Sequence, residues 1–198
     1  NNMLNRELWF PTPIYYGEMD VEGLEDYISN FVVLEKEKNQ DNLYSLNVVR
    51  EPPFQDLVKR LTAEAQQIFD NLYNGRKGSY KMNSLWINIS RTGEFHKLHM
   101  HPNCDLSGCV YIKTPEDCGN VFFEDPNFLQ KINQVEDNNN VINSMNRVSC
   151  EHTPTVGKVL FFPSWIRHQV EQNHSDETRI SMAFNFQLEF TDKSLFDH

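Results

Sequence analysis

The chain has 198 residues, of which 39% are hydrophobic, 12% aromatic and 23% charged. This length and composition are typical of a folded protein, and we expect one domain over residues 1–198. A net charge of −10 without a cluster of Lys or Arg disfavours binding to nucleic acid. No apolar run reaches the ~20 residues of a membrane-spanning helix, so we expect no association with a membrane.

The cysteine pattern indicates a reducing compartment. The four cysteines show no CxxC spacing, and the chain opens without a basic and then apolar signal segment. We therefore expect a cytoplasmic protein in which the cysteines are small buried hydrophobic residues. They are Cys104, Cys109, Cys118 and Cys150.

The first part of the chain reads as a helical support. Residues 8–16 combine aromatic residues with two prolines, which predicts an edge strand or an extended arm. Helical spacing of apolar residues predicts a helix over residues 21–36, followed by a polar loop over 35–42, and a second helix between Pro53 and Gly75. The second helix has an apolar stripe of Leu57, Leu61, Ala65, Ile68 and Leu72. Each helix has one apolar face, so residues 1–78 should pack on one sheet.

From Tyr80 onward the apolar pattern alternates, as it does in strands. Leu85, Ile87 and Ile89 fall on one face of the first strand, and Trp86 and Asn88 fall on the other. Further strands are predicted around the histidines that follow Thr92-Gly93 and over residues 107–112, 120–124, 157–162 and 178–190. Short strands after two helices predict a mainly β fold with flanking α-helices, an antiparallel barrel or sandwich with its core over residues 79–190.

Residues 127–156 interrupt this series with a long, polar, Asn-rich segment. Segments of this length in a compact domain are usually functional or partly mobile. We interpret it as an insert that acts as a lid or as a substrate-selecting wall.

The histidines suggest a metal site. In an extended strand, His99 and His101 project to one side, whereas His96 and Met100 project to the other. Two imidazoles on one face make half of a metal site, and His168, after the apolar run over residues 159–162, is the candidate third ligand. His96 and the distant His174 are expected outside the ligand set. A His-x-His pair with a distal His favours a metal site over a structural role.

The last strand adds a candidate anion site. Arg179 and Ser181 alternate with apolar residues and should point inward together. A buried guanidinium without a counter-charge costs several kcal/mol, and its planar fork matches a carboxylate or a phosphate. We therefore predict an anionic small molecule beside the metal.

These motifs resemble the iron(II)- and 2-oxoglutarate-dependent oxygenases of the prolyl-hydroxylase-like superfamily, which fold as a double-stranded β-helix. The resemblance runs from Phe10-Pro11-Thr12-Pro13 to Arg179-x-Ser181 and covers nearly the whole chain apart from residues 127–156. It implies that His99, His101 and His168 bind iron(II) and that Arg179 and Ser181 hold the far carboxylate of 2-oxoglutarate. It also implies that Tyr111 donates a further hydrogen bond to this co-substrate, that Asn88 and Trp86 line the pocket, and that O₂ is consumed, with ascorbate as a reductant.

One position departs from the superfamily pattern. His101 stands where an aspartate is usual, and three neutral imidazoles suit iron, zinc and copper alike. A three-histidine iron site like that of thiol dioxygenases is an alternative. Asp105 is a second candidate for the third ligand, although the residues between it and His101 break the strand alternation.

The first functional interpretation is a dioxygenase, a hydroxylase that couples the oxidative decarboxylation of 2-oxoglutarate to succinate with oxidation of a C–H bond. Its substrate would be a small molecule or a peptide. The alternatives are a cupin-like protein that binds a metal or a small anion without redox turnover, and a structural jelly roll. The N-terminal arm could pair with a second copy of the chain, which would give a homo-oligomer.

Overall fold

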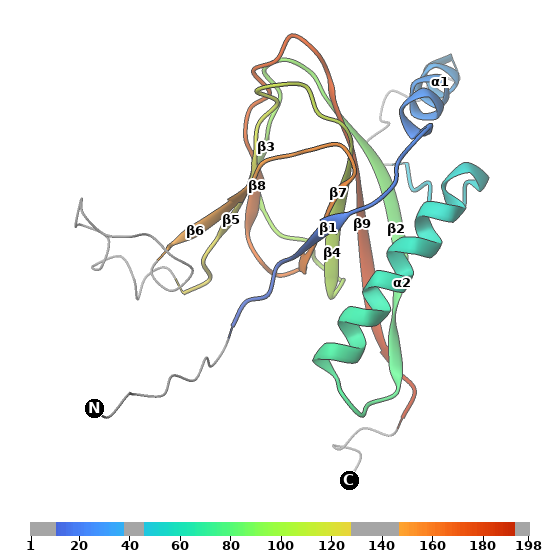
Figure 1. The fold of residues 1–198 in the computed structure, drawn as a ribbon, viewed down its shortest axis with the longest axis vertical. Coiled ribbons are helices and arrows are strands. Elements are labelled where there is room, and N and C mark those ends of the chain that lie inside the picture. Colours follow the sequence, from blue (N-terminus) through green and yellow to red (C-terminus); the bar gives the residue numbers. More distant parts are fainter. Residues whose placement is uncertain (1–10, 38–45, 128–146, 193–198) are drawn as a thin grey trace.

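The computed structural model describes residues 11–37, 46–127 and 147–192, whose strands form two antiparallel sheets (Figure 1). In order across the five-stranded sheet lie β1 (Tyr15–Glu18), β7 (Lys158–Pro163), β4 (Leu106–Lys113), β9 (Arg179–Phe190) and β2 (Gly78–Ser90). The four-stranded sheet has the order β3 (His96–His99), β8 (His168–Val170), β5 (Val121–Glu124) and β6 (Ser149–His152). The predicted mainly β architecture is therefore confirmed.

Two helices precede the strands β2 to β9. They are α1 (Leu24–Glu37) and α2 (Gln55–Leu72), and the short 3-10 helix η2 (Pro52–Phe54) leads into α2. The helix α1 runs to Glu37, so the loop predicted from residue 35 begins too early. Within the part of the chain that the structure describes, no helix is long and apolar enough to cross a bilayer.

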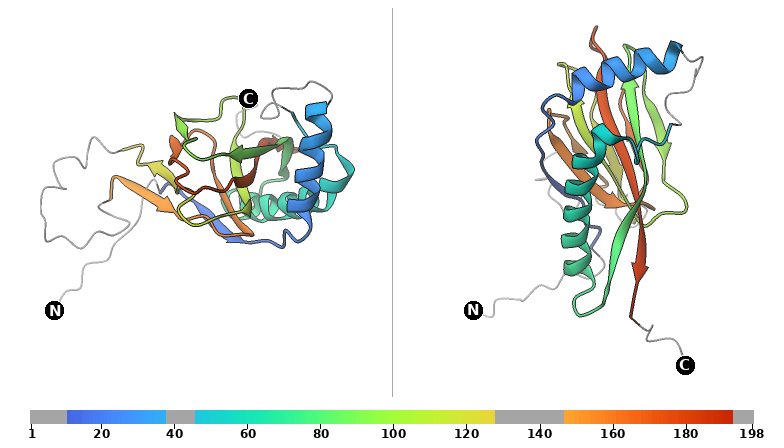
Figure 2. Two further views of the ribbon diagram at one scale, coloured as in Figure 1. Left: turned by 90° about the horizontal axis from the view of Figure 1, so that it is seen from above. Right: turned by 90° about the vertical axis from the view of Figure 1, so that its right-hand side faces the viewer.

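The helix α2 runs alongside β2, on the outer face of the five-stranded sheet (Figures 1 and 2). Four members of its predicted stripe are buried: Leu57, Leu61, Ala65 and Ile68. Leu72 was placed wrongly, because it is 47% exposed and Phe69 takes the buried position. The reason is an aromatic cluster in which Phe69 contacts Tyr73, Tyr80 and Phe190.

The two long strands β2 and β9 separate the main core from the interior between the sheets. The apolar residues of their outer faces share one core cluster with α2: Leu85, Ile87, Ile180, Met182, Phe184 and Phe186. The alternate residues line a cavity: Trp86, Asn88, Arg179, Ser181 and Ala183. The predicted faces of both strands are therefore correct, as expected for long strands whose side chains alternate.

Three other predictions need correction or lie outside the described residues. The strand β6 falls within residues 127–156 and pairs with β5, so this segment does not simply interrupt the strand series. Its middle, residues 128–146, lies outside the described residues, and the lid therefore stays a prediction. The edge strand of the N-terminal arm exists as β1, but it begins only at Tyr15.

Candidate active site

A cavity of about 290 Å³ contains most of the chemistry of the predicted site. Strands of both sheets line it, and its residues come from positions far apart in the sequence. They are Trp86, Asn88, His96, His99, His101, Gly108, Cys109, Tyr111, Val121, Phe162, His168, Val170, Arg179, Ser181 and Ala183. Every residue that the sequence analysis assigned to the metal or to the co-substrate therefore lines one cavity.

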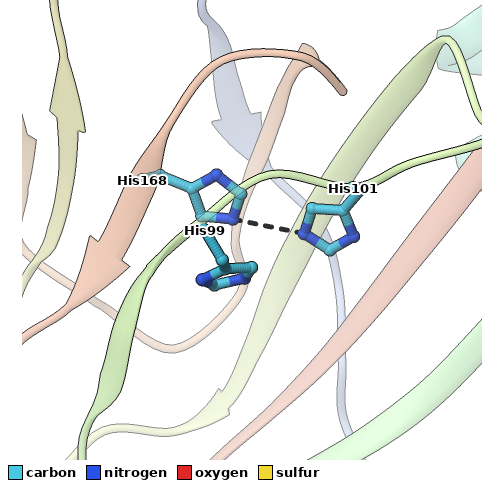
Figure 3. A group of neighbouring side chains, drawn as sticks. All are labelled: His99, His101 and His168. Carbon is cyan, nitrogen blue, oxygen red and sulfur yellow. Dashed lines mark hydrogen bonds between the residues drawn. The ribbon is translucent and has the colours of Figure 1, made fainter.

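Three histidines converge at this cavity (Figure 3). One ring nitrogen of each of His99, His101 and His168 lies within 4.8 Å of the others. The Nε2 atoms of His101 and His168 are 3.2 Å apart, and these two rings are nearly parallel. Such a group of nitrogen donors can surround one divalent transition-metal ion.

Backbone pairing places the three rings. His99 ends β3 and pairs with His168, the first residue of β8. His101 lies beyond the end of β3, where its N–H donates to the carbonyl oxygen of Ser164 at 2.9 Å. His99 and His101 therefore face the same side, as predicted, although only His99 lies on a strand and His101 lies on the following loop. Met100, between them, points away and is 55% exposed.

Two carbonyl oxygens orient the histidine rings. Nδ1 of His168 lies 3.0 Å from the carbonyl oxygen of Ile166, and Nδ1 of His99 lies 2.6 Å from that of Lys97. If each Nδ1 carries the proton and donates it to the carbonyl, the lone pair is on Nε2, as metal binding requires. This tautomer leaves both Nε2 atoms available as ligands.

Burial keeps two of the rings neutral. It lowers the pKa of His168 to about 3 and that of His101 to about 4, from an ordinary value of 6.5. The neighbouring histidines lower both further, while the hydrogen bond to Ile166 partly opposes the effect at His168. Neutral imidazoles are the form that binds a metal, so the site is ready for a cation at neutral pH.

Arg179 brings a positive charge to the same cavity. Its side chain is only 4% exposed, and its Nη1 donates to the carbonyl oxygens of Cys118 and Gly119, the latter at 3.2 Å. No carboxylate of the described residues forms an ion pair with it. Two carbonyl oxygens do not neutralise a guanidinium, so a buried charge of this kind favours an anionic ligand.

Polar side chains flank this charge. Ser181 is two residues along β9 from Arg179, and its register partners are Asn88 on β2 and Tyr111 on β4. Burial raises the pKa of Tyr111 well above its ordinary value, so its hydroxyl stays protonated and can donate a hydrogen bond. These side chains supply the polar contacts that a small ligand needs for orientation.

Asp105 does not join the histidines. Its carboxylate accepts a hydrogen bond from the backbone N–H of Leu188 at 2.8 Å, and it is absent from the cavity lining. Of the described residues, His99, His101 and His168 form the group that could hold a metal ion. This geometry supports His101, rather than Asp105, as the third ligand.

The comparison with protein families decides the class. A model of the family described as "Putative 2OG-Fe(II) oxygenase" matches residues 84–185, just over half of the chain. The chain belongs to this family. It is therefore a 2-oxoglutarate-dependent oxygenase, an oxidoreductase, and its family implies Fe(II) and 2-oxoglutarate.

Solved structures show the fold of this oxygenase. A prolyl-4-hydroxylase from Pseudomonas putida matches with a TM-score of 0.57 and 12% identity, over 89% of this chain and 88% of that chain. SnoN, a non-heme alpha ketoglutarate dependent epimerase from nogalamycin biosynthesis, matches with a TM-score of 0.58 and 11% identity, over 89% and 78%. A 2OG-Fe(II) oxygenase family protein from Burkholderia pseudomallei matches with a TM-score of 0.49 and 16% identity. This match covers 69% of the present chain but only 58% of the length of the Burkholderia protein. No curated protein matches.

The first two likenesses confirm the predicted double-stranded β-helix. The two proteins are named for different activities, hydroxylation in one and epimerisation in the other. The fold therefore does not fix the reaction, and the reaction of this oxygenase has to be argued from its site.

The residues fit the metal that the family implies. Three imidazole nitrogens are a donor set that iron(II) accepts, and one buried guanidinium suits a dicarboxylate. Because all three donors are neutral, the charge of a bound divalent ion would be balanced by the co-substrate and not by the protein.

Among the cavity residues with titratable side chains, sequence reasoning missed two. His96 was assigned to the opposite side of its strand, but it lines the cavity because the β3–β8 register is irregular between His96 and His99. Cys109 was treated as a buried hydrophobic residue, but it is only partly buried and faces the cavity beside Tyr111. A register irregularity of this kind leaves no signal in the alternation of polar and apolar residues. Cys109, by contrast, could have been predicted, because residues two apart on a strand share a face and Tyr111 was already assigned to the site.

The other cysteines follow the prediction only in part. Cys118 is buried, while Cys104 and Cys150 are partly exposed, and none of the four forms a disulfide. Burial raises the pKa of Cys109 to about 11, so this thiol stays protonated at neutral pH. A protonated thiol is a poor nucleophile, which argues against covalent catalysis at Cys109.

Proposed function

We propose that this oxygenase is an Fe(II)-dependent dioxygenase of the hydroxylase type. It would couple the oxidative decarboxylation of 2-oxoglutarate to succinate with oxidation of a C–H bond in a small molecule or a peptide. O₂ would be the oxidant, and ascorbate would keep the iron reduced. One observation carries the proposal: three converging imidazole nitrogens and a buried guanidinium, which has no carboxylate partner among the residues that the structure describes, line the same cavity.

The size of the cavity supports a small co-substrate. Its volume of about 290 Å³ lies just below the ~300–1,000 Å³ found for ligand sites. A five-carbon dicarboxylate suits such a space better than a nucleotide or a large cofactor does. A single cavity would then hold the co-substrate between the histidines and Arg179.

Each group of residues has one assigned task. His99, His101 and His168 would hold the iron, which when bound supplies the redox chemistry with O₂. Arg179 and Ser181 would grip the far carboxylate of 2-oxoglutarate, and Tyr111 would donate a further hydrogen bond. Asn88 and Trp86 would form the wall against which the co-substrate is oriented. The Trp86 ring also contacts His101, with 5.8 Å between the ring centroids.

The protein also controls water and charge in the cavity. Apolar side chains such as Phe162, Val121 and Val170 line it beside the polar ones. With a metal and an anion bound, they would limit the number of water molecules near the metal and would strengthen the attraction between Arg179 and the anion. The neutral state of His101 and His168 leaves one unprotonated nitrogen on each ring at physiological pH.

Succinate formation tests this function. The protein is incubated in air with Fe(II), ascorbate and 2-oxoglutarate, and succinate is quantified by mass spectrometry. We expect slow release even without the substrate, through uncoupled turnover, and none without O₂ or in the His168→Ala variant. A folded, iron-loaded protein that releases no succinate above background would contradict the proposal and favour a binding protein without redox turnover.

Hydroxylation needs its own measurement. Pools of small molecules and of peptides are screened for compounds that accelerate succinate release, and the products are analysed for a gain of one oxygen atom. Incorporation of label from ¹⁸O₂ into the product would support a hydroxylase. An accelerating compound that is epimerised or cyclised without gaining oxygen would keep the oxygenase class and overturn the hydroxylase assignment.

A further inference from the structure

A fourth histidine, His96, faces the cavity without belonging to the metal group. The register of β3 against β8 explains its direction. His99 pairs with His168 and His96 pairs with Val170, so three steps along β3 match two steps along β8. This irregularity turns His96 to the side that His99 also faces, and the ring centroids of the two histidines are 6.4 Å apart.

The pairing of the strands gives the depth of the cavity residues. Along β2, Trp86 lies beside the His101 ring and pairs with Ala183, whereas Ser90, four residues on, pairs with Arg179. The metal group therefore lies beside Trp86 in the direction of β2, and Arg179 lies beside Ser90, four residues farther along this strand. We call these two positions the metal level and the Arg179 level of the cavity. Asn88, which pairs with Ser181, lies between these levels.

The four-stranded sheet places His96 at the Arg179 level. Its partner Val170 also pairs with Val121 of β5. Val121 closely follows Cys118 and Gly119, whose carbonyl oxygens accept hydrogen bonds from Arg179. His96 therefore approaches the guanidinium end of the cavity from the opposite sheet.

The ring of His96 has no hydrogen bond to another described residue. Burial and then the positive charge of Arg179 lower its pKa, which favours the neutral imidazole. A neutral imidazole offers one N–H donor, and a carboxylate has two oxygens that a single guanidinium does not saturate. An anion bound by Arg179 would bring an acceptor to His96.

We propose that His96 is a second binding residue for the far carboxylate of the co-substrate, donating an imidazole N–H beside the Arg179 fork. This inference rests on the proposed function. It makes His96 a specificity-determining residue, which favours a 2-keto dicarboxylate over a 2-keto monocarboxylate of the same chain length. Both sheets then contribute to recognition, Arg179 and Ser181 from one and His96 from the other.

Binding without turnover tests the role of His96. Calorimetry measures the affinity of 2-oxoglutarate for the Co(II)-loaded protein in the absence of Fe(II). His96→Phe removes the donor and keeps a flat ring, and we expect it to weaken binding about 10-fold or more, as for the loss of a hydrogen bond to a charged group. His96→Gln keeps an N–H donor and should recover part of the affinity. His174→Phe, at an exposed position outside this cavity, is the matched control and should bind as the parent does.

A second ligand separates the role of His96 from a general loss of structure. The compound 2-oxopentanoate has the length of 2-oxoglutarate but lacks the far carboxylate, so the parent and His96→Phe should bind it equally. If His96→Phe binds 2-oxoglutarate within twofold of the parent, the inference is wrong. If it loses affinity for both keto acids or for Co(II) alone, His96 supports the metal group and the inference is also wrong. A parent that binds Co(II) but no 2-oxoglutarate would instead overturn the proposed function, and this inference with it.

Discussion

The Nε2 atoms of His101 and His168 lie 3.2 Å apart, although 67 positions separate these residues in the sequence. If Nδ1 of His168 donates its proton to the carbonyl oxygen of Ile166, the proton between the two Nε2 atoms belongs to His101. A bound metal would replace that proton, and His101 would then carry its proton on Nδ1. Metal binding is therefore coupled to a change of the His101 tautomer at this pair.

The same pair should make the stability of the metal-free protein depend on pH. The pKa values of His101 and His168 are about 4 and about 3 when folded, against 6.5 when unfolded. Below about pH 6.5 the unfolded chain binds protons that the folded chain does not, so the free energy of unfolding falls as the pH falls towards the folded pKa values. From pH 7 to pH 5 the loss should be about 2 kcal/mol for each histidine.

Urea unfolding of the metal-free protein at pH 7 and pH 5 measures this effect. The double variant His101→Gln/His168→Gln should lose much of the pH dependence of its unfolding free energy. Carboxylates also titrate between these pH values, but they contribute equally to the parent and to the variant and cancel in the comparison. An equal pH dependence in parent and variant would contradict the prediction. If the variant does not fold, NMR titration of the two imidazoles in the parent gives their pKa values directly.

The assignment of His101 as the third ligand predicts that substitutions at His101 and at Asp105 have very different effects on Co(II) affinity. His101→Ala removes a donor from the metal group, so it should weaken Co(II) binding by more than the ~10–100-fold typical of losing a residue that only orients a ligand. His101→Asp restores a donor and should recover most of the affinity. Asp105→Ala should leave Co(II) binding unchanged, because its carboxylate bonds to the N–H of Leu188 instead. Calorimetry compares the three variants, and a larger loss in Asp105→Ala than in His101→Ala would reverse the assignment.

The parts of the site on long, regular strands could be predicted from the sequence. Trp86 and Asn88 on β2, and Arg179 and Ser181 on β9, face the cavity as alternation requires. The prediction failed where the backbone departs from a regular strand. His96 faces the cavity because of the irregularity in β3, and no residue type in this stretch marks that irregularity.

Long-range contacts were equally hidden in the sequence. The position of His101 depends on a hydrogen bond to the carbonyl oxygen of Ser164, which belongs to a distant turn. The burial of Phe69 in place of Leu72 depends on aromatic rings of β2 and β9. Such contacts override local periodicity, because packing and not spacing decides which side chain is buried.

The packing of the five-stranded sheet around β4 predicts a strict requirement for glycine at position 108. A Cβ atom on Gly108 would lie 2.2 Å from the carbonyl oxygen of Leu160 and 2.3 Å from the ring of Phe184. Gly108→Ala should therefore destabilise the protein by about 1–3 kcal/mol or more, as overpacked cores do. Gly17→Ala is the matched control, since its Cβ would meet only Val159 at 3.8 Å, and it should change stability by less than about 0.5 kcal/mol. Urea unfolding measures both, and equal stability of the two variants would show that the sheet accommodates the added methyl group.

The fork geometry of Arg179 gives the last prediction. Arg179→Lys keeps the positive charge but loses the planar fork, so it should weaken 2-oxoglutarate binding to the Co(II)-loaded protein by about 10-fold. Arg179→Met also removes the charge and should weaken binding by about 100-fold or more, because a buried anion would be left without its partner. Both variants should bind Co(II) as the parent does, since Arg179 is not part of the metal group. Calorimetry in which Co(II) is titrated first and 2-oxoglutarate second separates an effect on metal binding from an effect on 2-oxoglutarate binding. An Arg179→Met variant that retains the affinity of the parent for 2-oxoglutarate would show that the far carboxylate is held elsewhere.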